Sequence, residues 1–160
     1  ILFENSDGIA RSAVFDSLFA REKLGSTGLG QGVAIPHGRA KGLKEAAGAL
    51  IRLKAPIPFD APDGKPVQTL FVLLVPDQAT DIHLQVLSEL AQRFSNRQLR
   101  EALLTAPTPE AAHALMVHAL ATHAEVVPAV GQARPHPPQW DALVRVSTSH
   151  PLGASPSQSA

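Results

Sequence analysis

The spacing of apolar residues predicts two helices that frame the rest of the chain. Over residues 8–22, Val14 and Leu18 lie one helical turn apart on a single stripe, which Arg21 ends. Over residues 80–94 the apolar side chains recur every three or four positions, which is typical of a helix with one buried face. Both segments are therefore expected to lie against a common core.

Short apolar runs predict strands between these helices. The runs lie at residues 33–35, 48–53 and 67–75. The last run is almost continuously apolar, as expected of a strand that is covered on both faces. Residues 56–66 are rich in Pro, Asp and Gly, which favour turns, so this stretch should join the second and third strands as a long hairpin. Asp60 and Asp63 are interpreted as turn-forming residues in that solvated loop.

Two further helices are predicted after the long amphipathic one. The sequence Ser-Asn-Arg-Gln from Ser95 resembles a capping box that opens a helix through Leu104. Thr108, followed by Pro and Glu, opens another helix through about Ala121. Their apolar faces are expected to pack on the sheet.

The composition changes after the last predicted helix. From His123 onward the chain is rich in Pro, His, Ser and Gln, and its prolines break any regular element. We therefore divide the chain into a domain over residues 1–122 and a linker or tail over residues 123–160. Within the tail, one apolar group is expected to dock on the domain as a short strand, and it consists of Trp140, Leu143, Val144 and Val146.

Composition and charge narrow the class of protein. The chain has 160 residues, enough for one ordinary domain, and its 14 Lys and Arg side chains balance 14 Asp and Glu side chains. Nucleic acid is not an expected partner, because no basic stripe is present. The absence of cysteine excludes disulfides and thiolate sites. A chain without cysteine fits a reducing compartment, so we expect a cytoplasmic protein. No apolar run approaches the roughly 20 residues of a membrane helix, so direct membrane insertion is not expected.

The strongest candidate for a functional residue lies just after the strand predicted over residues 33–35. Pro36 cannot continue a sheet ladder and Gly38 frees the backbone, so His37 is expected at the mouth of a turn, presented rather than packed. The loop before this strand is rich in glycine and can bring backbone N–H groups close to an anion. Its candidate phosphate-binding residues are Thr27, Gly28, Gly30 and Gly32. A histidine nucleophile facing such a loop favours phosphoryl transfer.

Two other kinds of site are less consistent with the sequence. Nucleotide binding at the glycines would require a Lys-Ser or Lys-Thr pair after them and a strand before the loop, and neither is present. The histidines near the end of the domain recur at every fifth position, which rotates each by about 140° on a helix, so they should not converge on one metal ion. These histidines are His113, His118 and His123.

The residues leading to His37 resemble a known signature. It begins at Glu22, continues after six residues with Leu-Gly, and after two more with Val-Ala-Ile-Pro-His-Gly. This pattern is similar to the active-site signature of the type-2 enzyme IIA domains of the bacterial phosphoenolpyruvate-dependent phosphotransferase system. The resemblance runs through about Leu120. Residues 58–76 and 83–104 resemble the nitrogen-regulatory branch more than the sugar-transport branches.

This resemblance implies a fold, a reaction and its partners. The fold would be α/β, with a mixed sheet flanked by helices on both faces, and an N-terminal strand and helix would precede Ile1. His37 would carry a phosphoryl group received from an HPr-like donor, without a cofactor or metal. The phosphorylated protein would regulate targets such as kinases or transporters, or would pass the group to a IIB domain of a sugar system. A regulatory binding module that needs no phosphorylation is a third reading.

Two further candidate catalytic residues come from the same resemblance. Without the resemblance, Arg21 would be interpreted as a residue that complements the helix dipole at its C-terminus. His83 would be interpreted as a core residue on the apolar face of a helix. In the family, an arginine of this Arg-Glu pair and a histidine in an HLxxL helix lie close to the phosphorylated histidine. We therefore expect Arg21 and His83 near His37, where they would stabilise charge on the phosphoryl oxygens.

Overall fold

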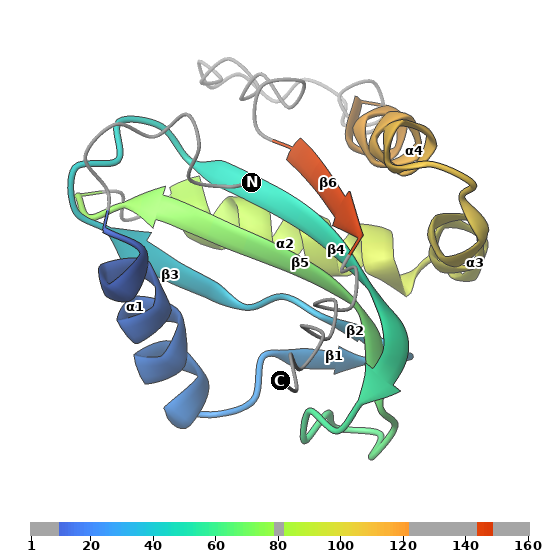
Figure 1. Cartoon of the computed structure of the whole chain (residues 1–160), viewed down its shortest axis with the longest axis horizontal. Helices are drawn as coiled ribbons and strands as arrows, with labels where there is room; N and C mark the ends of the chain where they lie inside the picture. Colours follow the sequence, from blue (N-terminus) through green and yellow to red (C-terminus); the bar gives the residue numbers. More distant parts are fainter. Residues whose placement is uncertain (1–9, 79–81, 122–143, 149–160) are drawn as a thin grey trace, which may run out of the picture.

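A computed structural model of the protein describes residues 10–78, 82–121 and 144–148 (Figure 1). Each helix and strand predicted from the apolar pattern is present. In chain order the elements are α1 (Arg11–Lys23), β1 (Gly28–Gly30), β2 (Val33–Ala34), β3 (His37–Ala40), β4 (Ala47–Ile57), β5 (Val67–Pro76), α2 (Ile82–Ser95), α3 (Arg97–Thr105), α4 (Pro109–Ala121) and β6 (Val144–Thr148). No helix of the described residues is long and apolar enough to cross a membrane.

The sheet is mixed, as predicted. β5 lies at its centre, with β4 antiparallel on one side and both β2 and β3 parallel on the other. β1 pairs antiparallel with β2, and β6 pairs in parallel with β4 at the opposite edge. The hairpin predicted from the turn residues between residues 56 and 66 is the β4–β5 pair.

Helices lie on both faces of the sheet (Figure 1). Successive side chains of β5 point to opposite sides, so this strand contributes to a core on each face. Leu73 belongs to the large core with Leu90 of α2 and Met116 of α4, and all three are fully buried. The next side chain, Leu74, packs with Val14 of α1 on the other face. Burial of a side chain of this size contributes about 2 kcal/mol. The two cores therefore fix α1 and α2 on opposite faces of β5, the strand with which β3 pairs.

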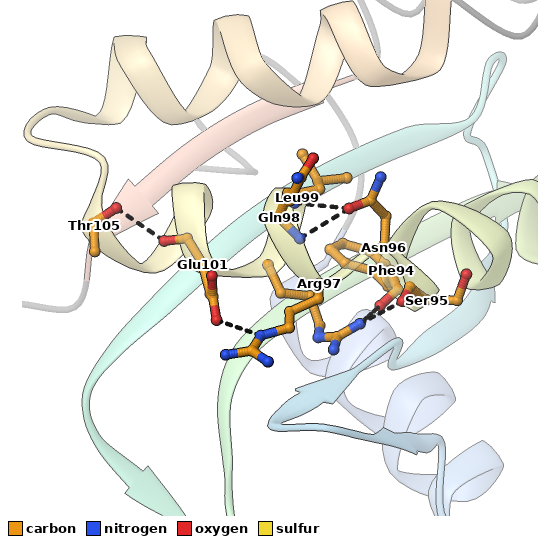
Figure 2. Close-up of polar contacts among 9 residues, drawn as sticks. Phe94, Ser95, Asn96, Arg97, Gln98, Leu99, Glu101 and Thr105 are labelled. Carbon is orange, nitrogen blue, oxygen red and sulfur yellow. Dashed lines mark hydrogen bonds and ion pairs between the residues drawn. The ribbon is translucent and has the colours of Figure 1, made fainter.

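Figure 2 shows the short turn between α2 and α3, where the predicted cap is wrong by one residue. The side chain of Asn96 accepts the N–H groups of Gln98 at 2.8 Å and Leu99 at 3.2 Å, so Asn96 caps α3. The capping-box pattern assigned this role to Ser95. Because α2 continues through Ser95, the serine hydroxyl instead donates to the carbonyl of Gln92 at 2.5 Å.

Two arginines satisfy carbonyl groups at helix ends. Arg100 donates to the carbonyls of Phe94 at 2.6 Å and Ser95 at 2.7 Å, which are at the end of α2. Arg52 of β4 reaches the end of α3, where it donates to the carbonyl of Ala106 at 2.7 Å. The last carbonyls of a helix have no partner within it, so these side chains complete both ends.

The C-terminal part of the chain adds the edge strand β6. Its backbone confirms the short strand expected around Val144 and Val146, whereas Trp140 and Leu143 lie outside the described residues. The segment from 123 to 160 therefore contributes to the sheet. The domain boundary at residue 122 stays a prediction.

Candidate active site

His37 is the first residue of β3, beside the central strand β5. The expectation that it lies at the mouth of a turn after Pro36 is wrong, because pairing with β5 resumes at once and His37 lies opposite Leu73. Proline has no N–H group to donate, but the carbonyl of Pro36 accepts the N–H of Leu73 at 2.9 Å. The backbone therefore stays hydrogen-bonded to β5 at the proline.

The glycine after His37 is required by packing and not, as expected, by an unusual backbone angle. Gly38 is not among the residues with positive φ. A Cβ atom there would lie 2.7 Å from Oγ of Ser17 in α1, which leaves no room for a side chain. The same oxygen accepts the N–H of Arg39 at 2.9 Å. α1 therefore lies directly against β3, and its last turn is brought to His37.

Two hydrogen bonds hold the imidazole of His37. Its Nδ1 lies 2.9 Å from the carbonyl oxygen of Ile35, which can only accept, so Nδ1 carries a proton. Nε of Arg21 lies 3.0 Å from Nε2, and an arginine N–H can only donate, so Nε2 is unprotonated. Both partners require the same neutral tautomer. In that tautomer the lone pair of Nε2 can act as a nucleophile.

The surroundings of His37 also favour its neutral form. Burial is the largest cause and lowers the pKa of His37 from the ordinary value of 6.5. The hydrogen bond to Ile35 raises this pKa, the nearby side chains of Arg21 and His83 lower it, and the carboxylate of Glu22 raises it. The net direction of the pKa is downward, so the ring is neutral at pH 7.

We expect the His37 ring to titrate below pH 6.5 when its nitrogen signals are followed by NMR. The unfolded chain binds the proton more readily than the folded protein. The stability from this group is therefore complete above pH 6.5 and is lost as the pH falls through the folded pKa. Arg21→Ala removes a positive charge and should raise the measured pKa. A wild-type ring that titrates above 6.5 would contradict this account of its surroundings.

Arg21, His37 and His83 meet at one open pocket of about 340 Å³. They come from α1, β3 and the first turn of α2. Nδ1 of His83 is buried and has no hydrogen-bond partner among the described residues. The remaining lining residues of the pocket are Ser17, Ala20, Leu24, Gly38, Arg39, Leu73 and Val75. The structure thus brings together the three side chains that the sequence named as candidate catalytic residues.

The loop that was expected to bind phosphate does not line this pocket. Its candidates were Thr27, Gly28, Gly30 and Gly32. The loop uses its donors internally, since the N–H of Thr27 donates to the Glu22 carboxylate at 2.8 Å and the N–H of Gly28 donates to Oγ of Ser26 at 3.1 Å. These N–H groups are therefore not available to an anion in this arrangement.

Contacts with the β4–β5 hairpin account for two of these glycines. A Cβ atom on Gly28 would lie 2.9 Å from Ala61, and one on Gly30 would lie 3.1 Å from the carboxyl group of Asp63. Asp63 also accepts the N–H of Gln31 at 2.7 Å and that of Lys65 at 3.1 Å. Asp63 is thus a turn residue, as interpreted, and it also fastens the glycine loop.

Two residues at the site were not singled out from the sequence. Glu22 is the first residue of the signature, and its carboxylate fastens the loop after α1 through Thr27. Ser17 is a polar residue within the buried stripe of α1, and it holds the backbone beside His37 through Arg39. A polar residue in an otherwise apolar stripe was the available signal for Ser17.

Comparison with known proteins identifies a family that spans the site. The family model described as "Phosphoenolpyruvate-dependent sugar phosphotransferase system, EIIA 2" matches residues 3–119. This match includes every residue that lines the pocket.

Similar proteins cover the same part of the chain. A nitrogen regulatory protein of Pseudomonas aeruginosa is 49% identical over 104 residues, which are 65% of this chain and 68% of that protein. The crystal structure of the nitrogen regulatory protein IIA-Ntr from Neisseria meningitidis has a TM-score of 0.63 and 60% identity, over 66% of this chain and 72% of that one. A fructose-specific EIIA component of Haloferax volcanii is 38% identical over 100 residues, 62% of this chain and 65% of that protein.

Proposed function

The chain belongs to the EIIA 2 family of the phosphoenolpyruvate-dependent phosphotransferase system, and from this premise we propose that it is a phosphocarrier whose acceptor is His37. His37 accepts a phosphoryl group from an HPr-like donor protein. The phosphorylation state of the protein then acts as a regulatory signal. One observation carries the proposal. His37 is neutral with its proton on Nδ1, and its Nε2 lone pair lies at a pocket shared with Arg21 and His83.

The transfer step exchanges one phosphorus–nitrogen bond for another. The lone pair of Nε2 on His37 forms a bond to phosphorus, while the bond to the donor imidazole breaks and its electron pair returns to the donor. The two bonds are similar in energy, so the protein has to align the groups and stabilise the phosphoryl oxygens. Nδ1 keeps its proton throughout and donates it to the carbonyl of Ile35.

Arg21 and His83 are the candidates for stabilising this charge. The Nε–H of Arg21 donates to Nε2 before the reaction, so it has to leave that lone pair when the bond to phosphorus forms. A phosphoryl oxygen bound to Nε2 would lie close to the same donor. His83 lines the same pocket, and its buried Nδ1 has no hydrogen-bond partner among the described residues, so it is a candidate to bind a phosphoryl oxygen.

Regulation through phosphorylation follows from the charge that the group adds. A phosphate replaces a neutral ring by a group with roughly two negative charges, which can create or disrupt an interface. Two similar proteins are nitrogen regulatory proteins, and their identity to this chain exceeds that of the fructose component. We therefore propose nitrogen-related regulation, with targets such as kinases or transporters. The alternative is a sugar-specific IIA that feeds a IIB domain, which the likeness to the fructose component favours.

The test of the carrier function is a reconstituted system of enzyme I, HPr and phosphoenolpyruvate. Intact-mass measurement at alkaline pH should show one phosphoryl group on the protein, and acid treatment should remove it, as expected of a phosphohistidine. A wild-type protein that gains no group in this system would overturn the proposal.

Regulation is tested by comparing the partners of the two states. The protein phosphorylated on His37, the unphosphorylated protein and His37→Ala serve as baits in cell extract. A regulator should bind its target in one state and lose it in the other, with His37→Ala behaving as the unphosphorylated form. If all three recover the same partners, and the phosphoryl group passes rapidly to a sugar-specific IIB domain, the transport alternative is correct.

A further inference from the structure

The last turn of α1 directs two consecutive side chains toward the site. Arg21 reaches His37 directly, whereas Glu22 binds Thr27 through both of its carboxylate oxygens. One oxygen accepts the N–H of Thr27 at 2.8 Å and the other accepts its hydroxyl at 2.5 Å. Thr27 is only 7% exposed, so water competes little for these bonds. Hydrogen bonds to a charged group in such surroundings are strong, so Thr27 is held firmly.

A continuous series of hydrogen bonds leads from Thr27 to the imidazole. The carbonyl of Thr27 accepts the N–H of Ile35 at 3.0 Å. The carbonyl of Ile35 accepts the Nδ1 proton of His37 at 2.9 Å. Ile35 is itself buried at 3% exposure, which fixes its side chain in the large core. Each residue in the series is therefore held by the one before it.

We propose that Glu22 is a positioning residue for His37, which acts through Thr27 and Ile35 to keep the ring proton on Nδ1 and the Nε2 lone pair directed at the pocket. One turn of α1 then holds both sides of the ring, with Arg21 on Nε2 and Glu22 on Nδ1 through the series. The use of this device in phosphoryl transfer rests on the proposed function. The geometry of the ring does not, so it can be measured separately.

A purely structural role for Glu22 would be to close the loop between α1 and β1. That role predicts a change in stability when the carboxylate is removed, without any change in the His37 tautomer. The positioning role predicts that the tautomer distribution changes, because a ring released from the carbonyl of Ile35 is held in its tautomer by Arg21 alone, and a larger fraction of rings can then carry the proton on Nε2. The distribution of the proton between the two ring nitrogens therefore separates the two roles.

The first measurement follows the ring nitrogens of His37 by NMR in the unphosphorylated full chain at neutral pH. Glu22→Ala should raise the fraction of rings that carry the proton on Nε2, and Thr27→Val, which removes only the hydroxyl bond, should do so to a smaller extent. Thr27→Ser keeps the hydroxyl and should show the wild-type signals. Glu45→Ala, which removes an exposed carboxylate from another loop, should leave the ring unchanged.

The second measurement is the rate of phosphoryl transfer from HPr. A reacting atom misplaced by about 1 Å can cost about 10²-fold in rate. Glu22 acts on His37 only through Thr27 and Ile35, so its removal should reduce the rate by less, and we expect Glu22→Ala to be slower by about 10-fold. Thr27→Ser should approach the wild-type rate, and Glu45→Ala should equal it.

The outcomes separate this inference from the proposed function. If Glu22→Ala keeps its fold and shows the wild-type tautomer, the positioning role is wrong. If Glu22→Ala does not fold, Thr27→Val decides, and a wild-type tautomer in that variant overturns the role equally. A wild-type protein that accepts no phosphoryl group, but whose tautomer responds to Glu22→Ala, would refute the phosphocarrier function and leave the positioning of the ring intact.

Discussion

A His37→Ala variant should gain no phosphoryl group under conditions in which the wild-type protein gains one from phosphoenolpyruvate, enzyme I and HPr. The imidazole of His37 supplies the Nε2 lone pair at the pocket, and alanine has no nucleophilic atom. The measurement is intact mass at alkaline pH, where phosphohistidine survives. The loss should be complete, because the acceptor atom itself has been removed.

Two other histidine variants make this result specific. His118 is exposed on α4 and is not among the residues that line the pocket, so His118→Ala should accept the phosphoryl group as the wild type does. His83→Ala should still accept it, although more slowly. If His37→Ala accepts the group while His83→Ala does not, the acceptor has been assigned to the wrong histidine.

Arg21→Ala should slow phosphoryl transfer by about 10² or more while leaving the fold intact. Removing one preorganised donor to developing charge typically costs that much. The substitution has a second effect of opposite sign, because it frees the Nε2 lone pair from the hydrogen bond that occupies it before the reaction. We expect the loss of charge stabilisation to dominate, since the phosphoryl oxygens carry charge throughout the transfer. Single-turnover kinetics with phosphorylated HPr would measure the rate.

The controls for Arg21 use the same helix and the same charge. Arg11→Ala removes an exposed arginine at the other end of α1 and should leave the rate unchanged. Arg21→Lys keeps the charge but loses the planar guanidinium, so its rate should lie between those of the wild type and Arg21→Ala. His83→Ala should be slowed to a similar degree as Arg21→Ala. Transfer at the wild-type rate in Arg21→Ala and His83→Ala would reduce both residues to structural roles.

The parts of the fold that depend on residues close together in the sequence could be predicted. α2 follows from apolar positions that recur every three or four residues, and β5 follows from a nearly continuous apolar run. At the site, His37 stood out because it follows a proline at the end of an apolar run. Arg21 and His83 came from a resemblance, and the structure places all three at one pocket.

The parts that depend on contacts between distant segments could not be predicted. The return of His37 to the sheet requires β5 alongside, where Leu73 lies opposite His37 and donates its N–H to the carbonyl of Pro36. Gly38 appears in the sequence as a free backbone position, and only the approach of Ser17 shows that it is a packing requirement. The glycine loop suggested an anion site because its backbone N–H groups appear free in the sequence. In the structure some of them are already paired, as the N–H of Thr27 is with Glu22.

The edge strand β6 is joined to β4 by the pairing that spans the longest stretch of chain among the described strands, with Val144 opposite Gly48. Bringing such distant segments together costs more loop entropy than closing the β4–β5 hairpin, so this pairing should form after it. Among the described residues β6 is the strand that pairs with this edge of β4, so during synthesis the edge lacks this partner until residues 144–148 have left the ribosome. An open edge is a template for pairing with another chain. We thus expect β6 to protect the newly made protein from aggregation, a task separate from the chemistry at His37.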